Sequence, residues 1–286
     1  MNEHGKTFLI TGGNTGIGKA TAIGLARTGA QVVFTSRSRE KGERALADIR
    51  RESGNQNVAC MHLDLASLAS IREFAAGFLA KYPRLDVLVL NAGLMVGSRS
   101  ETADGFEMTF GVNHLGHFAL TGLLLGRLKE SSPARIVVVS SDAHRAARGG
   151  LDFADLQARA GYNMWTAYGR SKLANLLFTL ELAERLQGSG VTVNALHPGV
   201  VATEFGAAED VGKLLGFLMR AFSWAMISAE KGARTSVYLA TSPEVEGVSG
   251  RFYARCRPKQ PRRAARNRDI ARRLWQVSEE LTGVRY

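Results

Sequence analysis

The chain has 286 residues, of which 45% are hydrophobic and 22% charged, and this composition fits one globular α/β domain because no linker-like segment divides it. No run of 18 apolar residues occurs, and the best candidate, 214–227, is short and contains Arg220, so no transmembrane span is predicted. Residues 1–6 lack the apolar core of a signal peptide, and we therefore expect a soluble, cytoplasmic protein.

The net charge of +11 is unevenly distributed, because residues 251–273 contain ten lysines and arginines and a single acid, Asp269. Such a basic segment can engage nucleic acid, an anionic membrane surface or an acidic partner. Aromatic residues are not interleaved with the basic ones through the segment, and no nucleic-acid motif accompanies it. A solvated surface is therefore the favoured interpretation, and no nucleic-acid partner is expected.

Residues 7–26 have the pattern of a strand, a glycine turn and a helix. The apolar run 8–10 indicates a buried strand, Gly12, Gly16 and Gly18 indicate a tight turn, and apolar residues from Ile17 onward have helical spacing. A helix N-terminus beside such a turn offers backbone N–H donors and the positive end of the helix dipole to a diphosphate. A second apolar run begins about 20 residues after the turn, as expected for one βαβ unit.

Strand-like and helix-like segments alternate through the rest of the chain. The other expected strands are 31–36, 58–63, 85–90, 135–140, 191–196 and a possible seventh, 251–254. The other expected helices are 39–53, 67–82 with Ser67 as N-cap, 104–128, 163–187, 230–240 and 270–281. This order predicts a single α/β domain with a Rossmann-type, doubly wound parallel sheet of about seven strands and helices on both faces. Ligands bind beyond the carboxyl ends of such strands.

Apolar residues crowd the segment 203–227, between the sixth expected strand and the helix 230–240. Among them are Phe205, Phe217 and Trp224. Two interpretations are equally supported. In one, the segment is an ordinary core or dimer contact. In the other, residues 203–228 form a mobile apolar lid that covers a substrate pocket.

Four polar residues have the chemistry of a proton-transfer site. Tyr168 and Lys172 are one turn apart on the expected helix 163–187, so they share a face. A close ammonium lowers the pKa of a tyrosine, which makes the pair a usable proton donor and acceptor. Ser141 supplies a hydroxyl at the end of a strand, and Asn113 adds an amide. A Tyr–Lys pair alone is typical of a helix surface, but the four residues together favour catalysis.

Several short motifs occur in a fixed order over residues 7–203. They are Thr11-Gly12-x-x-x-Gly16-Ile17-Gly18, Asp64-Leu65, Asn91-Ala92-Gly93, Asn113-His114-Leu115-Gly116-His117-Phe118, Ser140-Ser141, Tyr168-x-x-Ser171-Lys172 and His197-Pro198-Gly199-Val200-Val201-Ala202-Thr203. In these motifs, and again in 271–281, the sequence resembles the short-chain dehydrogenase/reductases, and within them the retinol dehydrogenase group. It departs from the family at Leu90, where a second asparagine is common, and in the long interval from Ser141 to Tyr168.

The resemblance implies a role for each matched residue. Tyr168 would give a proton to a carbonyl that Ser141 orients, Lys172 would bind the nicotinamide ribose and tune Tyr168, and Asn113 would support a proton relay. The implied cofactor-binding residues are Gly12, Asn14, Thr15, Gly16, Ile17, Gly18, Arg37, Lys41, Asp64, Leu65, Asn91, Ala92, Gly93, Tyr168, Lys172, Pro198, Gly199, Val201 and Thr203. The dinucleotide-binding part would span about 5–140 and the catalytic and substrate part about 141–286. Relatives are often dimers or tetramers, so a homodimer or homotetramer is expected.

The choice of cofactor can be argued from charge at the end of the second strand. An NAD site of this type places a carboxylate there, which accepts from the ribose hydroxyls. Here Ser36 is followed by Arg37, with Arg39 and Lys41 close behind. A 2′-phosphate would meet cations, so the sequence predicts NADP(H). A solvated helix start is the alternative interpretation of these charges.

No metal is expected. His114 and His117 are three residues apart on a helix, but no third ligand is apparent, and a packing role is favoured. Cys60 and Cys256, far apart in the sequence, indicate neither a disulfide framework nor a metal site.

Together these features predict an NADP(H)-dependent oxidoreductase that interconverts an apolar alcohol and its aldehyde or ketone, as the resemblance to retinol dehydrogenases implies. Two alternatives stay open. One is reduction of a carbon–carbon double bond, because protochlorophyllide reductases also resemble this group. The other is a non-catalytic NADP(H)-sensing protein that binds a partner through the basic segment.

Overall fold

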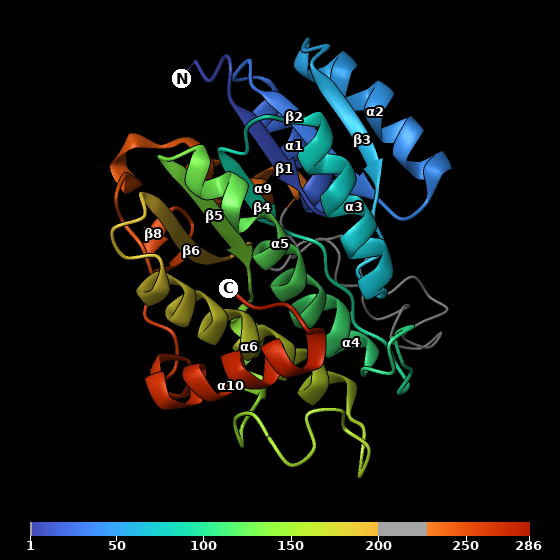
Figure 1. The fold of residues 1–286 in the computed structure, drawn as a ribbon, viewed down its shortest axis with the longest axis vertical. Coiled ribbons are helices and arrows are strands. Elements are labelled where there is room, and N and C mark those ends of the chain that lie inside the picture. The colour runs from blue at the N-terminus through green and yellow to red at the C-terminus, as the bar shows by residue number, and fades with distance from the viewer. Residues whose placement is uncertain (1, 200–227) are drawn as a thin grey trace.

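The computed structural model describes residues 2–199 and 228–286 and contains one eight-stranded sheet (Figure 1). Its strand order is β3-β2-β1-β4-β5-β6-β7-β8. The strands are β1 (Thr7–Ile10), β2 (Gln31–Ser36), β3 (Val58–His62), β4 (Val87–Leu90), β5 (Ala134–Val139), β6 (Val191–His197), β7 (Phe252–Ala254) and β8 (Arg257–Pro258). All neighbouring pairs are parallel except β7 and β8. From β1 the chain adds β2 and β3 on one side and then β4 on the other side. In such folds a crevice for ligands forms at this switch point, between β1 and β4.

Helices cover both faces of the sheet, which confirms the doubly wound α/β fold. On one face α1 (Gly16–Ala26), α2 (Arg39–Ser53) and α9 (Ala229–Thr241) bury Leu25, Ile49 and Leu239 against the strands. On the other face lie α3 (Leu68–Lys81), α5 (Gly116–Glu130) and α6 (Met164–Arg185). The near-continuous apolar strands are explained by this double covering, since both of their faces are buried.

An outer helix, α10 (Arg268–Thr282), packs against α6 and α5 (Figure 1). Its Trp275 is buried with its ring centre 5.0 Å from that of Phe118 and 5.9 Å from that of Phe178. Tyr286 lies against the same tryptophan and donates a 2.6 Å hydrogen bond from its hydroxyl to the carbonyl of Phe118. The C-terminal part of the chain therefore completes the core on this side.

Two sequence predictions need correction. The sheet has eight strands where about seven were expected, because Arg255 and Cys256 adopt φ values of 51° and 59° and turn the chain back as β8. The expected helix 104–128 begins later, as the short α4 (Met108–Phe110), and α5 follows it. Gly105, at φ 79°, turns the chain, and the carboxylate of Glu107 then accepts hydrogen bonds from the N–H groups of Thr109 and Phe110.

Other boundaries agree with the sequence to within a few residues. The hydroxyl of Ser67 caps α3 by accepting from Ser70 N, as predicted. None of the helices within 2–199 and 228–286 combines the length and apolar character that crossing a bilayer requires. The apolar segment 203–227, interpreted as a lid or a contact, lies outside the described residues.

Candidate active site

The glycine turn after β1 forms a cradle at the start of α1. Gly12 and Gly16 have φ values of 64° and 51°, which favour glycine. A Cβ on Gly18 would overlap the carbonyl oxygen of Gly12 and lie 2.5 Å from Nδ2 of Asn91. The Thr15 side chain makes no capping hydrogen bond at the start of α1. This combination of close backbone packing and a helix N-terminus suits a diphosphate.

Thr11 joins the glycine turn to the residues after β4. Its hydroxyl oxygen accepts from the backbone N–H groups of Asn91 and Ala92, at 2.9 and 3.0 Å. The Asn91 amide in turn donates to the carbonyls of Thr11 and Gly12, at 2.9 and 3.2 Å. The two loops at the crevice are therefore locked to each other, and the sequence analysis gave Thr11 no role of its own. Its signal in the sequence was its place as the first residue of the glycine motif, at the end of a strand.

The end of β2 presents cations to solvent. Arg37 and Lys41 are exposed, and no ion pair connects either with residues 2–199 or 228–286. Arg39 differs, because its guanidinium pairs with Glu43 at 2.8 Å. Gly12 N and Gly13 N donate to Thr35 near the end of the same strand, at 3.1 Å each. The two unpaired cations thus lie just beyond a strand end that is bonded to the glycine cradle, Arg37 next to β2 and Lys41 in the first turn of α2.

Two further expected cofactor positions lie on the same edge of the sheet. Asp64 follows β3 and accepts from Ala66 N through Oδ1 at 2.9 Å, and Leu65 beside it is buried. Pro198 and Gly199 follow β6, with Gly199 at φ 97°. Val201 and Thr203 lie outside the described residues.

Ser141, Tyr168 and Lys172 come together beyond the end of β5. Lys172 Nζ donates to the carbonyl of Val139 at 3.1 Å and lies 5.5 Å from the centre of the Tyr168 ring. The side chains of Tyr168 and Ser141 are hydrogen-bonded. Ser141 Oγ also accepts from Ala143 N at 3.1 Å, because Ser141 caps the 3₁₀ helix Asp142–Ala146. These three predicted residues therefore form one cluster.

Burial controls the acidity of this cluster. It raises the pKa of Tyr168 to about 12, although the hydrogen bond with Ser141 acts in the opposite direction. It lowers the pKa of Lys172 to about 8. The sequence predicted that the ammonium would lower the pKa of Tyr168, and that expectation is wrong for this structure because desolvation of the phenolate outweighs it. Tyr168 is held in its protonated form, as a proton donor requires.

Asn113 lies within a short π-helix, Gly111–Leu115, between α4 and α5. Its fully buried amide accepts from Leu94 N at 2.8 Å and donates to Leu94 O at 2.9 Å and to Ser171 Oγ at 3.0 Å. A Cβ on Gly93 would lie 3.2 Å from Asn113 Oδ1 and 3.4 Å from Lys172 Nζ. Asn113 therefore fastens the loop after β4 to α6. Helix irregularities of this type are frequent at functional sites.

The two histidines near Asn113 are buried, and their ring nitrogens are used within the protein. His117 Nδ1 donates to Asn113 O at 3.1 Å, so Nε2 accepts from the Thr11 hydroxyl at 2.9 Å. His114 Nε2 lies 2.9 Å from Ser278 Oγ. Burial lowers the pKa of each histidine to about 3, so both are neutral. Within the part of the chain that the structure describes, no group of three potential metal-ligating side chains occurs.

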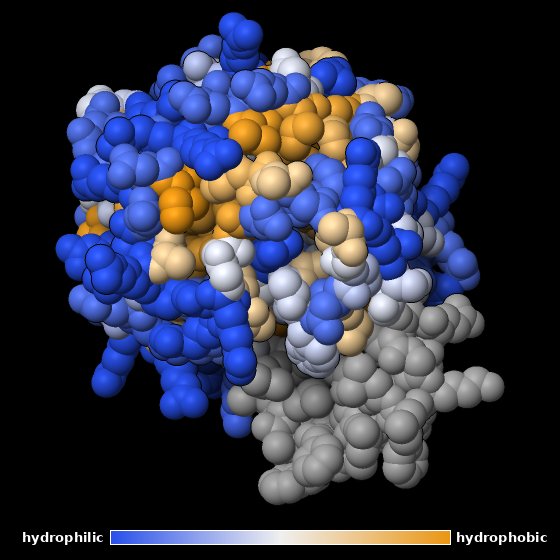
Figure 2. All heavy atoms as spheres, turned by 90° about the horizontal axis from the view of Figure 1, so that it is seen from below, coloured by the Kyte–Doolittle hydropathy of each residue, from blue (hydrophilic) through white to orange (hydrophobic). Residues whose placement is uncertain are grey.

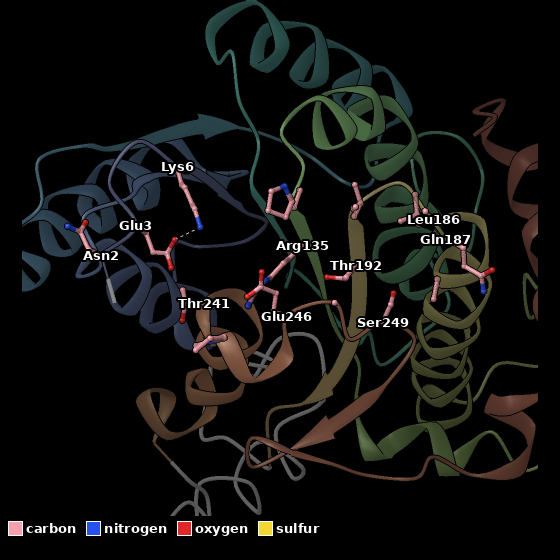
Figure 3. Close-up of a pocket in the computed structure, with 18 residues that line it drawn as sticks. Asn2, Glu3, Lys6, Arg135, Leu186, Gln187, Thr192, Thr241, Glu246 and Ser249 are labelled. Atoms are coloured by element: carbon pink, nitrogen blue, oxygen red, sulfur yellow. Dashed lines mark ion pairs between the residues drawn. The ribbon is translucent and has the colours of Figure 1, made fainter.

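A hollow of about 750 Å³ lies at the opposite edge of the sheet, at the amino ends of β5 and β6 (Figure 3). Figure 3 shows Arg135 and Glu246 near its middle, and the ion pair of Lys6 with Glu3, 2.7 Å long, at one side. The Arg135 guanidinium donates to the carbonyl of Ser242 at 2.8 Å and thereby holds the end of α9. None of the residues predicted for the site lines this hollow.

Comparison with known proteins gives the family of this chain. A family model described as short chain dehydrogenase matches residues 6–212. The chain belongs to the short-chain dehydrogenase family.

Within this family the chain is similar to the retinol dehydrogenases. It is 48% identical to human retinol dehydrogenase 14 over 98% of this chain and 87% of that protein. Among solved structures, an uncharacterized protein from Mycobacterium paratuberculosis is 37% identical with a TM-score of 0.80, over 100% of this chain and 96% of that one. The complex of RhlG with NADP from Pseudomonas aeruginosa is 27% identical with a TM-score of 0.69, over 88% and 94% of the two chains.

This short-chain dehydrogenase also contains site residues that the sequence analysis missed. Ser171 accepts from Asn113 and donates to the carbonyl of Tyr168 at 2.8 Å. Ser140 Oγ donates to the carbonyl of Lys172 at 2.8 Å. Both serines belong to the matched motifs Ser140-Ser141 and Tyr168-x-x-Ser171-Lys172, but the sequence analysis assigned neither of them a role of its own.

Proposed function

We propose that this short-chain dehydrogenase interconverts an apolar alcohol and its aldehyde or ketone, with NADP(H) as cofactor and Tyr168 as the acid and base. The observation that carries the proposal is the cluster of Ser141, Tyr168 and Lys172 beyond β5, on the same edge of the sheet as the glycine cradle. When bound, the nicotinamide supplies a hydride to the carbonyl carbon, or removes one from the alcohol.

The chain's own residues would manage the oxygen and the proton. Ser141 Oγ accepts from Ala143 N and is hydrogen-bonded with Tyr168, which holds the hydroxyl where it would orient a carbonyl oxygen. Tyr168, with its pKa raised to about 12, holds the proton that the developing alkoxide needs. Lys172 places positive charge beside the Tyr168 ring, which stabilises the phenolate left after proton transfer.

Charge at the end of β2 supports NADP(H) over NAD(H). Ser36 ends the strand where an acidic residue would favour ribose hydroxyls, and the exposed Arg37 and Lys41 are free of ion pairs with residues 2–199 and 228–286. A phosphate on the 2′-oxygen would gain charge-assisted hydrogen bonds from these two side chains. The family neighbour RhlG forms a complex with NADP.

An exposed aromatic side chain near Tyr168 and the similarity to retinol dehydrogenases support an apolar substrate. Figure 2 views the molecule from below, the side toward which the arrowheads of β3 and β5 point in Figure 1. Apolar side chains gather in a band over the middle of this face, with hydrophilic side chains around them. Trp165, in the first turn of α6 and three residues before Tyr168, is 50% exposed. Retinol dehydrogenases are also the relatives at 48% identity.

The test is a fluorescence titration with NADPH and NADH, followed by hydride transfer to medium-chain aldehydes, retinal and simple ketones. We expect tighter binding of NADPH and turnover that is lost in Tyr168→Phe. Tyr168→Phe should still bind NADPH, which separates loss of chemistry from loss of fold. Absence of NADPH oxidation by the wild-type protein across the whole panel would contradict the proposal.

A further inference from the structure

The basic segment 251–273 is docked, in part, on the loop that follows Ser141. Arg262 reaches this loop with its guanidinium, which donates to the carbonyls of Arg145 at 3.1 Å, Ala147 at 2.9 Å and Arg148 at 3.3 Å. The planar fork of arginine can serve several carbonyls at once, which the point charge of a lysine cannot. The Arg262 side chain is therefore hydrogen-bonded to three carbonyls of the loop that follows Ser141.

Arg262 also acts on Ser141 through His144. The Arg262 backbone N–H donates to His144 Nε2 at 3.3 Å, so the ring proton is on Nδ1, which donates to the Ser141 carbonyl at 2.7 Å. The ring is buried with its edge toward Phe252, 5.7 Å between ring centres. Burial lowers the pKa of His144, which keeps this tautomer neutral. Backbone atoms of Ser141 are thus tied to the basic segment through one side chain.

A second tie runs through Asp142, the residue after Ser141. Lys259 Nζ lies 2.6 Å from Asp142 Oδ2, and His197 Nε2 lies 3.4 Å from the same oxygen. Asp142 N donates to His197 Nδ1 at 3.3 Å, and His197 immediately precedes Pro198 and Gly199. Asp142 therefore joins Lys259 of the basic segment to His197 at the end of β6.

We infer that Lys259 and Arg262 are positioning residues for the Ser141 hydroxyl, an inference that rests on the proposed carbonyl chemistry. The two ties converge on residues 142 and 144, on either side of Ala143, whose N–H fixes Ser141 Oγ at 3.1 Å. Rotation of the 3₁₀ helix Asp142–Ala146 would carry that N–H away and turn the hydroxyl out of line with Tyr168. Two of the ten basic residues of the segment thus have a role inside the protein.

If Lys259 and Arg262 position the Ser141 hydroxyl, their substitution lowers kcat through that hydroxyl and not through loss of the folded state. We expect Lys259→Met and Arg262→Met each to lower kcat by about tenfold to 100-fold, since small misplacements have effects of that size. The KM for NADPH and the melting temperature should change little. Lys259→Arg should restore kcat because it keeps the charge beside Asp142, whereas Arg262→Lys should not. Arg263→Met, which removes an exposed neighbour in the same segment, is the matched control.

The decisive measurement repeats Lys259→Met and Arg262→Met in a Ser141→Ala background, by single-turnover kinetics. If both residues act through the hydroxyl, the second substitution causes no further loss once the hydroxyl is absent. An equal further loss in that background would overturn the inference while leaving the proposed function intact. A wild-type protein that turns over no carbonyl would instead overturn the proposed function and this inference with it.

Hydrogen exchange supplies a readout that is independent of turnover. Amides of residues 142–148 should exchange faster in the Lys259→Met/Arg262→Met double variant than in the wild type, because the loop loses its ties. The rates in Arg263→Met should match the wild type. Unchanged exchange over 142–148 in the double variant would also overturn the inference.

Discussion

The ammonium of Lys172 lies 5.5 Å from the centre of the Tyr168 ring, on the same face of α6, and donates to the carbonyl at the end of β5. Lys172 is buried and Tyr168 is half-buried, and desolvation changes their pKa values in opposite directions, to about 12 for Tyr168 and about 8 for Lys172. At neutral pH the tyrosine keeps its proton, and most of the lysine population keeps its charge.

This relationship predicts the pH dependence of carbonyl reduction. Lys172 loses its proton as the pH rises through about 8, and the positive charge that stabilises the Tyr168 phenolate is then lost. We expect kcat to be constant below that pH and to fall above it. Tyr168 stays protonated over the same range, because its pKa is about 12, and so contributes no second decrease.

A steady-state pH profile from 6 to 10 measures this, with Lys172→Arg as the control. Arginine stays charged, so the variant, although less active, should show no decrease near pH 8. A decrease at the same pH in both proteins would assign it to another group.

The glycine cradle predicts a large effect from a single methyl group. In Gly18→Ala the new Cβ would overlap the Gly12 carbonyl and meet the Asn91 side-chain amide. Neither can move away easily, because the carbonyl is part of the backbone and the amide is hydrogen-bonded to the Thr11 carbonyl. We expect NADPH binding to weaken by about tenfold or more, as the loss of one good hydrogen bond to a charged group would produce. The measurement is a fluorescence titration, alongside thermal unfolding.

Gly126→Ala is the matched control for this substitution. Gly126 lies in α5 with open space around the position of its Cβ. Alanine there should raise the free energy of unfolding by about 0.5–1 kcal/mol, because glycine is unfavourable inside a helix. Binding of NADPH should not change.

The sequence predicted which residues lie together wherever the direction of the strands alone brings them to one edge of the sheet. Gly12, Asn91 and Ser141 each follow a parallel strand, so their meeting at one edge is a consequence of strand direction alone. Ser67 was predicted as a cap from local chemistry, and its hydroxyl makes the expected bond. A strand end and a helix cap can each be predicted from the few residues around them.

Other features depended on contacts that no local pattern records. β8 forms because two non-glycine residues, Arg255 and Cys256, adopt left-handed backbone angles. The contacts of Lys259 and Arg262 join segments more than 100 residues apart. The raised pKa of Tyr168 follows from desolvation by the residues that the fold packs around it, and only the structure gives those surroundings.

The cations after β2 predict a selective effect on cofactor preference. In Arg37→Met/Lys41→Met a 2′-phosphate would lose two charge-assisted partners, so affinity for NADPH should fall by about tenfold or more while that for NADH changes little. Titrations with both cofactors measure the ratio.

Arg39→Met is the control for this pair, because Arg39 is an exposed cation of the same turn that is already paired with Glu43. It should leave the ratio unchanged. Equal loss of affinity for both cofactors in the double variant would mean that the two cations do not bind the 2′-phosphate.

The packing of α10 predicts the largest change in stability. Trp275 is 1% exposed and contacts Phe118, Phe178 and Tyr286, so Trp275→Ala leaves a cavity between α10 and the helices beneath it. We expect the free energy of unfolding to fall by roughly 3–5 kcal/mol, the usual result of truncating a buried aromatic residue. Trp165→Ala removes the same side chain from a position that is 50% exposed, and should change stability by about 0.5 kcal/mol or less. Urea unfolding of the two variants measures the difference, and equal effects would show that α10 contributes no more to the core than an exposed helix end does.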